Sequence, residues 1–253
     1  MTDSSIKDPN YKERRKVEEL DLISRYHGRF KGIGFAMPLN QLEMYHALKD
    51  WIRDNCVTKN IQFPKFIWKP KICDVGCGLG WGSNILSQEA DFVWGIDKNE
   101  ENIRWAKQCF ERQKNNTYWT PQLSFDKVDI LEESRELMKF DIVAAIEIIE
   151  HMEDFQGLLN FLKRLAKKDK SGNLQEPPNG TVFWISTPNR NADEIQKDTP
   201  KNEHHVREWT AGEFYQVLIE NFKYVTLFNH NLTKTLELDT KETPMMAKAE
   251  FPL

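Results

Sequence analysis

The chain has 253 residues, 40% of them hydrophobic and 29% charged, which is the composition of an ordinary globular protein with one large core. Its net charge of −4 argues against a dedicated nucleic-acid-binding protein, and no apolar run is long enough to cross a bilayer. The first 20 residues are polar and lack the apolar segment of a signal peptide, so we expect a cytoplasmic protein. The four cysteines are too few and scattered for a disulfide framework, and we expect them to stay reduced.

The N-terminal part of the chain shows no regular alternation of strands and helices. We predict a disordered tail over residues 1–10 and a helical annex over residues 11–70 that covers a ligand pocket. Within the annex, apolar residues at helical spacing predict a helix over residues 41–55, at Leu42, Tyr45, Leu48 and Ile52. Several aromatic residues could line an acceptor pocket, but we expect most of them to pack the annex on the main domain: Tyr26, Phe30, Phe35, Tyr45 and Trp81.

From residue 71 to residue 253, strands and helices alternate. Strands are predicted over residues 71–75, 91–97, 123–130, 140–147, 181–189 and 223–231, with a last edge strand from residues 243–253. Helices are predicted over residues 80–90, 99–113, 153–169 and 210–222, the last with Thr210 as its N-cap. This order predicts an α/β domain with a doubly wound, mostly parallel sheet, whose ligands bind beyond the C-terminal ends of the strands.

A glycine-rich turn, DVGCGLGWG, follows the first predicted strand. Glycines accept positive φ angles and let the main chain approach a ligand closely, although such a turn alone is weak evidence for a nucleotide. Acidic residues at the ends of the next two strands, Asp97 and Asp129, strengthen the evidence for a nucleotide site. A carboxylate there can bind a ribose diol or an adenine amino group. A site with this negative charge favours a sulfonium cofactor over a pyrophosphate.

The segments CDVGCGLGWGS, GIDKNEENIRWA, DKVDI and FDIVAAIEIIEHMED together resemble the class I S-adenosylmethionine (SAM)-dependent methyltransferases over residues 71–230. The resemblance implies a Rossmann-like sheet of seven strands with the last antiparallel, and SAM as the cofactor. It also implies that three glycines wrap the methionine portion, that Asp97 holds the ribose, and that Asp129 with Ile130 frames the adenine. The residues expected at the cofactor are Asp74, Gly76, Cys77, Gly78, Gly80, Asp97, Lys98, Asp129, Ile130 and Glu147.

A second group of ionisable residues follows the fourth and fifth predicted strands. Glu147, Glu150 and His151 would share one face if their turn is helical, and His205 lies in the later segment HHVREWT. Neighbouring strands should bring the two loops together near the methyl group. His151 or His205 would then remove the proton of an acceptor hydroxyl, or a divalent Mg²⁺ or Mn²⁺ ion would bind and acidify it, and Glu147 is counted with the two histidines among the catalytic residues. The remaining alternative is that this group of ionisable residues has a purely structural role.

The segments EIIEHMED, TPN and HHVREWT resemble the metal-dependent methyltransferases that modify the 2′-hydroxyl at the 3′ end of small RNAs. That resemblance places Glu147, Glu150, His151 and His205 around the ion. Similar segments occur in metal-free relatives that act on small molecules and sugars. We therefore expect a hydroxyl of a small molecule or glycan as the acceptor, with metal-dependent RNA methylation and a non-catalytic SAM-binding module as alternatives. Basic clusters at residues 12–16 and 163–170 are either solvated helix faces or contacts for an anionic partner.

Overall fold

The structure is a computed structural model that describes residues 39–56, 58–59, 67–111, 122–176, 179–192, 200 and 202–253. The span Pro38–Leu253 forms one compact unit. The predicted tail, the basic cluster at residues 12–16 and the aromatic residues Tyr26, Phe30 and Phe35 lie outside the described residues. No described helix is both long and apolar enough to span a membrane.

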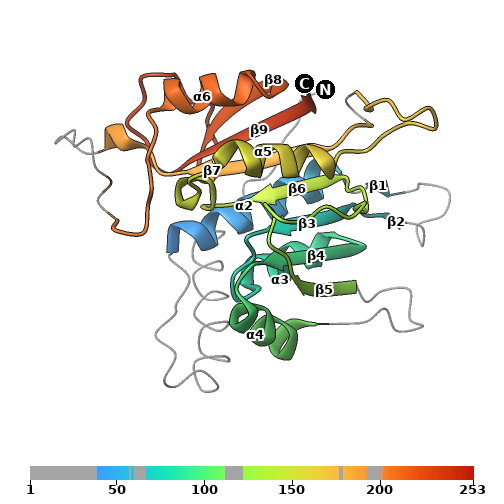
Figure 1. Cartoon of the computed structure of the whole chain (residues 1–253). Coiled ribbons are helices and arrows are strands. Elements are labelled where there is room, and N and C mark those ends of the chain that lie inside the picture. Colours follow the sequence, from blue (N-terminus) through green and yellow to red (C-terminus); the bar gives the residue numbers. More distant parts are fainter. Residues whose placement is uncertain are drawn as a thin grey trace, which may run out of the picture. The chain divides into compact units, whose positions relative to one another are not determined.

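A seven-stranded sheet organises this unit, with strand order β5-β4-β3-β6-β7-β9-β8 (Figure 1). The neighbouring strands are parallel except where β9 takes part. This arrangement confirms the predicted doubly wound α/β fold, with the strand order reversing between β3 and β6. The strands are β3 (Lys71–Val75), β4 (Phe92–Asp97), β5 (Gln122–Lys127), β6 (Ile142–Ala145), β7 (Val182–Thr187), β8 (Phe222–Asn229) and β9 (Met245–Pro252).

The prediction that residues 243–253 form an edge strand is wrong. Strand β9 lies between β7 and β8 and pairs with both, so β8 is the edge. The physical reason is visible in the burial of Met245, Met246 and Ala247, three consecutive residues with no exposed surface. Consecutive residues of a strand point to opposite faces, so all three can be buried only where both faces of the sheet are covered.

Helices cover both faces of the sheet, as predicted (Figure 1). On β7, Phe183 and Ile185 belong to the core under α5 and α6, whereas Trp184 packs edge to face with Trp51 of α2. Thr210 caps α6 in a reciprocal capping box with Glu213, which confirms its predicted role. The helices are α2 (Leu39–Asn55), α3 (Trp81–Leu86), α4 (Glu100–Phe110), α5 (Phe155–Arg164) and α6 (Ala211–Ile219).

Helix α2 confirms the helix predicted over residues 41–55, and it packs against α3 within the same compact unit as the sheet. A short antiparallel pair, β1 (Thr58–Lys59) and β2 (Ile67–Trp68), follows it and had no signal in the sequence. The division of the chain at residue 70 stays a prediction.

Candidate active site

The glycine loop between β3 and α3 leaves its main chain open at one position. Gly76, Gly78 and Gly80 all have positive φ angles, of 72°, 52° and 83°. A Cβ atom on Gly80 would lie 2.8 Å from Ala106 and from the ring of Phe125, so that glycine is needed for packing. A Cβ atom on Gly78 would meet no atom of the other described residues within 4 Å, apart from its two chain neighbours. Gly78 therefore presents bare main chain to open space, as a cradle for a ligand requires.

Asp97 lies at the end of β4, directly beside this loop. Its Oδ2 accepts a hydrogen bond from the Gly78 amide at 3.0 Å, and its Oδ1 accepts one from the Asn99 amide at 2.7 Å. Each carboxylate oxygen has a further lone pair, so both remain able to accept a hydrogen bond from a ribose diol. The exposed Lys98 follows. The position of Asp97 thus suits the role that the resemblance implies.

The predicted strand over residues 123–130 is shorter in the structure, because β5 ends at Lys127. Asp129 lies in the turn that follows, where its main-chain oxygen accepts hydrogen bonds from the amides of Glu132 and Glu133. Its side chain is exposed and the neighbouring Ile130 is half-buried. Both residues therefore lie beyond the sheet, at the edge where the adenine of a bound nucleotide would be expected.

Asp74 is fully buried beneath the glycine loop. Its Oδ1 accepts a hydrogen bond from the Tyr45 hydroxyl at 2.9 Å, and its Oδ2 accepts one from Ser83 Oγ at 2.6 Å. Burial raises the pKa of Asp74 to about 6, although both hydrogen bonds lower it. Gly82 makes room for the Tyr45 ring, since a Cβ atom there would lie only 2.1 Å from it. Asp74 thus joins α2 and α3 to the loop. The side chain of Cys77, within the loop, is also buried.

Sequence reasoning missed the hydrogen bond from the Tyr45 hydroxyl to Asp74. Its ring packs as expected, but nothing in the sequence links it to an acid 29 positions away. Trp81 likewise packs, edge to face with Phe110.

Glu147 follows β6 in a left-handed conformation, with φ of 54°. Ser186 of β7 holds it there, because its Oγ accepts a hydrogen bond from the Glu147 amide and donates one to Oε1, both at 2.8 Å. A non-glycine residue in this region costs about 1 kcal/mol, which this reciprocal pair offsets. The expected helical face shared by Glu147, Glu150 and His151 is therefore not formed, since the short 3₁₀ helix spans only Ile149–His151.

Glu150 is completely buried, and neither of its carboxylate oxygens has a hydrogen-bond partner among the described residues. Burial, followed by the nearby charge of Glu147, raises the pKa of Glu150 well above its ordinary value. Its main-chain oxygen accepts hydrogen bonds from the amides of Val206 and Arg207, at 2.8 and 3.3 Å. These bonds join the loop after β7 to the turn after β6, so the predicted convergence of the two loops is confirmed.

The two imidazoles of the site lie edge to face, with ring centroids 4.8 Å apart. His151 Nδ1 lies 2.9 Å from the main-chain oxygen of His204, which can only accept, so Nδ1 carries the proton and Nε2 keeps a lone pair. Burial lowers the pKa of His151, and His205 lowers it further. His205 contacts the Glu208 carboxylate at 2.7 Å through Nδ1 and the Asn202 amide at 2.9 Å through Nε2.

Three of the four predicted metal ligands come together. Glu150, His151 and His205 each offer a ligand atom, and these atoms lie within 4.8 Å of one another; Glu147 is not in this group. Sequence reasoning missed Glu208, which orients His205 from three positions further along HHVREWT. The three-residue spacing from His205 to Glu208 was the signal in the sequence that could have indicated this pair.

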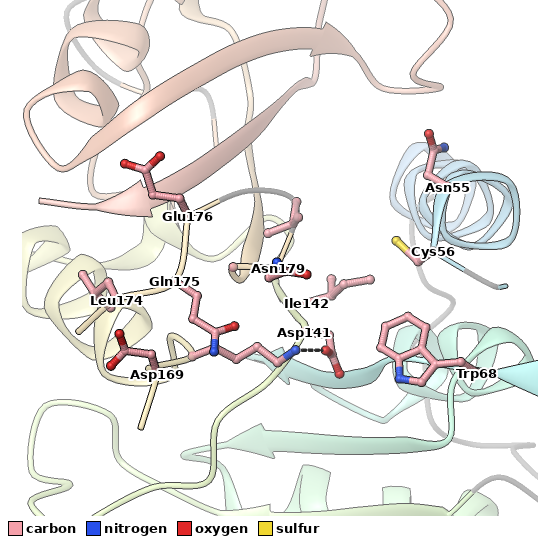
Figure 2. Close-up of a pocket in the computed structure, with 13 residues that line it drawn as sticks. Asn55, Cys56, Trp68, Asp141, Ile142, Asp169, Leu174, Gln175, Glu176 and Asn179 are labelled. Atoms are coloured by element: carbon pink, nitrogen blue, oxygen red, sulfur yellow. Dashed lines mark ion pairs between the residues drawn. The ribbon is translucent and has the colours of Figure 1, made fainter. Parts of the chain in front are cut away.

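A cavity of about 830 Å³ lies at the other end of β6 and β7 (Figure 2). Asn55 and Cys56 at the end of α2, Trp68 of β2 and the ion pair between Lys167 and Asp141 line it. None of the predicted site residues contributes to it. This cavity is therefore separate from the cofactor and reacting edge.

A family model described as a methyltransferase domain matches residues 69–231. The chain belongs to the class I SAM-dependent methyltransferases. It is 32% identical over 120 residues to a ubiquinone biosynthesis O-methyltransferase of Coxiella burnetii. The matched region covers 47% of this chain and 44% of that protein. The chain spans about half the length of curated relatives such as this one.

Two solved structures share the fold of this methyltransferase. The N-methyltransferase NodS of Bradyrhizobium japonicum, in complex with S-adenosyl-L-homocysteine (SAH), is 14% identical with a TM-score of 0.55, over 93% of this chain and 99% of NodS. The small RNA methyltransferase HEN1 is 20% identical with a TM-score of 0.56, over 86% of this chain and 26% of HEN1. Together with the family match, these similarities identify SAM as the cofactor.

Proposed function

We propose that this methyltransferase transfers the methyl group of SAM to a hydroxyl group of a small molecule or glycan. When bound, SAM supplies an electrophilic methyl group on a positively charged sulfur. The open main chain at Gly78 and the carboxylate of Asp97 fit that cofactor. Similarity to an O-methyltransferase of ubiquinone biosynthesis supports a small hydroxylated acceptor.

The observation that carries this proposal is the state of His151. The His204 carbonyl holds its Nδ1 proton, and its lowered pKa keeps the ring neutral at neutral pH, so Nε2 can accept the proton of an acceptor hydroxyl. Glu150 Oε1 lies 4.0 Å from Nε2, where the positive charge of the imidazolium that results would lower the raised pKa of Glu150 and favour its ionised form. Ser186 fixes Glu147 at the end of the neighbouring strand, where it would position the acceptor.

The test compares His151→Ala with His230→Ala, a histidine that pairs with Glu43 outside the site. Turnover on a panel of catechols and sugars should fall about 100-fold or more in His151→Ala, because general base catalysis is lost. SAH affinity measured by calorimetry should be unchanged in both variants. Equal turnover in His151→Ala would remove it from catalysis, and failure of the wild-type protein to bind SAH would refute the proposal. Binding of SAH without turnover on any acceptor would indicate a non-catalytic module.

A second candidate function is metal-dependent methylation of an RNA 2′-hydroxyl. The buried Glu150 carboxylate favours it, because neither oxygen has a hydrogen bond from the described residues and an ion would satisfy both. Glu150, His151 and His205 would hold the ion, which would acidify the hydroxyl. Hydrogen bonds from Nδ1 of both histidines to His204 and Glu208 leave each Nε2 oriented as metal sites require, although the Asn202 amide would have to leave His205.

Chelation separates the two candidates. With EDTA, methylation of RNA 3′ ends should stop and return on addition of Mn²⁺ if the ion is needed. Methylation of small hydroxylated acceptors by His151 as a base should continue unchanged in EDTA. If the site holds a metal ion, Glu150→Gln should abolish Mn²⁺ binding, because an amide is a much weaker ligand than a carboxylate.

A further inference from the structure

A second concave site lies at the opposite edge of the sheet from the glycine loop. It is a pocket of about 720 Å³ between the segment that precedes β6, the end of α5 and the end of β9. We call it the basic pocket. Its charged lining consists of one acidic side chain, Glu136, and five basic ones, Arg135, Lys139, Lys163, Arg164 and Lys168.

Three basic side chains of the basic pocket, Lys139, Arg164 and Lys168, form no ion pair with a carboxylate among the described residues. Lys139 Nζ donates to the main-chain oxygen of Arg164 at 2.7 Å. Arg135 differs, because it pairs with the Glu133 carboxylate. A main-chain oxygen orients an ammonium group but does not cancel its charge, so the positive charge of Lys139 persists in the pocket.

The basic residues are also crowded together. Burial lowers the pKa of Lys139, and the nearby charges of Lys168 and Arg164 lower it further, while the charge of Glu136 raises it. A solvated helix face would spread such residues apart, whereas Lys139, Lys163 and Arg164 are half-buried around one hollow. In a chain with a net charge of −4, this concentration of positive charge is a local feature that an anion would relieve.

We infer that the basic pocket binds the phosphate groups of an anionic ligand. Arg164 is already occupied, since its guanidinium donates to the main-chain oxygens of Glu133 and Arg135. The lysines remain as point charges, which suit a multiply charged phosphate. The site is separate from the methyl donor, because β6 runs from this edge toward Glu147. The ligand would be either a free polyphosphate or the backbone of an RNA strand.

The experiment uses the whole chain and two probes, inorganic tripolyphosphate by calorimetry and a labelled single-stranded RNA by fluorescence anisotropy, both at low salt. The double variant Lys163→Gln/Lys168→Gln is compared with Lys234→Gln/Lys241→Gln, which removes the same charge from exposed positions outside the lining of the pocket. We expect the first to weaken phosphate binding about tenfold or more, and the control to change it less than about twofold. SAH affinity should be the same in all proteins, which separates this site from the methyl-transfer site.

Binding of tripolyphosphate would identify the ligand as a free polyphosphate. Binding of RNA alone would identify it as the backbone of an RNA strand. Failure of both probes to bind the wild-type protein would overturn the inference. An equal loss of binding in the control variant would do so too, since it would show only a general effect of net charge. Lys168→Gln alone, at an exposed position, provides a folded variant if the half-buried Lys163 is needed for stability.

Discussion

Replacing Tyr45 by phenylalanine removes one hydroxyl from beneath the glycine loop. The hydroxyl donates to Asp74 Oδ1 at 2.9 Å, and both side chains are almost completely buried. The phenylalanine ring would still fill the space beside Gly82, so the packing should be retained. Asp74 would keep Ser83 Oγ as its one side-chain donor. The change therefore isolates a single hydrogen bond to a buried carboxylate.

The size and sign of the effect follow from the pKa of Asp74. A hydrogen bond to a charged group contributes about 2 kcal/mol, so we expect the free energy of unfolding to fall by that amount at pH 8. Burial raises the pKa of Asp74 from 3.8 to about 6 in the folded protein, so its contribution to stability is present below pH 3.8 and is lost as the pH rises through about 6. That loss is ~3 kcal/mol in the wild-type protein. Tyr45→Phe destabilises the charged form further, so its effect should be smaller at pH 5.

The measurement is urea unfolding followed by tryptophan fluorescence at pH 5 and pH 8. Tyr215→Phe serves as the matched control, because Tyr215 is a half-buried tyrosine packed against the core. The control should change the free energy of unfolding by less than about 0.5 kcal/mol at either pH. An equal loss at both pH values for Tyr45→Phe, or a loss below about 0.5 kcal/mol at pH 8, would refute the reasoning.

Four further predictions concern the cofactor and reacting edge. Gly80→Ala should lower the free energy of unfolding by about 2 kcal/mol or more in a urea titration, because its Cβ would lie 2.8 Å from the Phe125 ring. Gly78→Ala should lower it by only about 1 kcal/mol yet weaken SAH binding in calorimetry, since the added methyl meets only the ligand. Asp97→Ala should weaken SAH binding by about 2 kcal/mol through lost charge-assisted hydrogen bonds, and unchanged affinity would contradict its ribose role. The turnover of wild-type protein should fall at acid pH as His151 becomes protonated, with a midpoint below its ordinary 6.5, and a midpoint above that value would contradict the direction of its pKa.

Over residues 71–253, the sequence by itself determined the order of strands and helices along the chain, and it predicted the edge of the sheet at which the cofactor binds. Strong local signals made this possible: the glycine run from Gly76 to Gly80, the capping residue Thr210 and apolar periodicity in each helix. The position of Asp97 at the end of β4, beside the glycine loop, was predictable because parallel strands present their C-terminal ends at one edge, whatever the details of packing. These features depend on residues close together in the chain, so the sequence carries them directly.

Only the tertiary structure decided which residues meet. The insertion of β9 between β7 and β8, the bond from Tyr45 to Asp74, and the hold of Ser186 on Glu147 all join segments far apart in the chain. The left-handed φ of Glu147 broke the helical face that spacing predicted, because a residue on a neighbouring strand stabilises that conformation. The burial of Glu150, whose carboxylate has no hydrogen bond from the described residues, could not be predicted either, since burial is a property of the whole core and not of any local pattern.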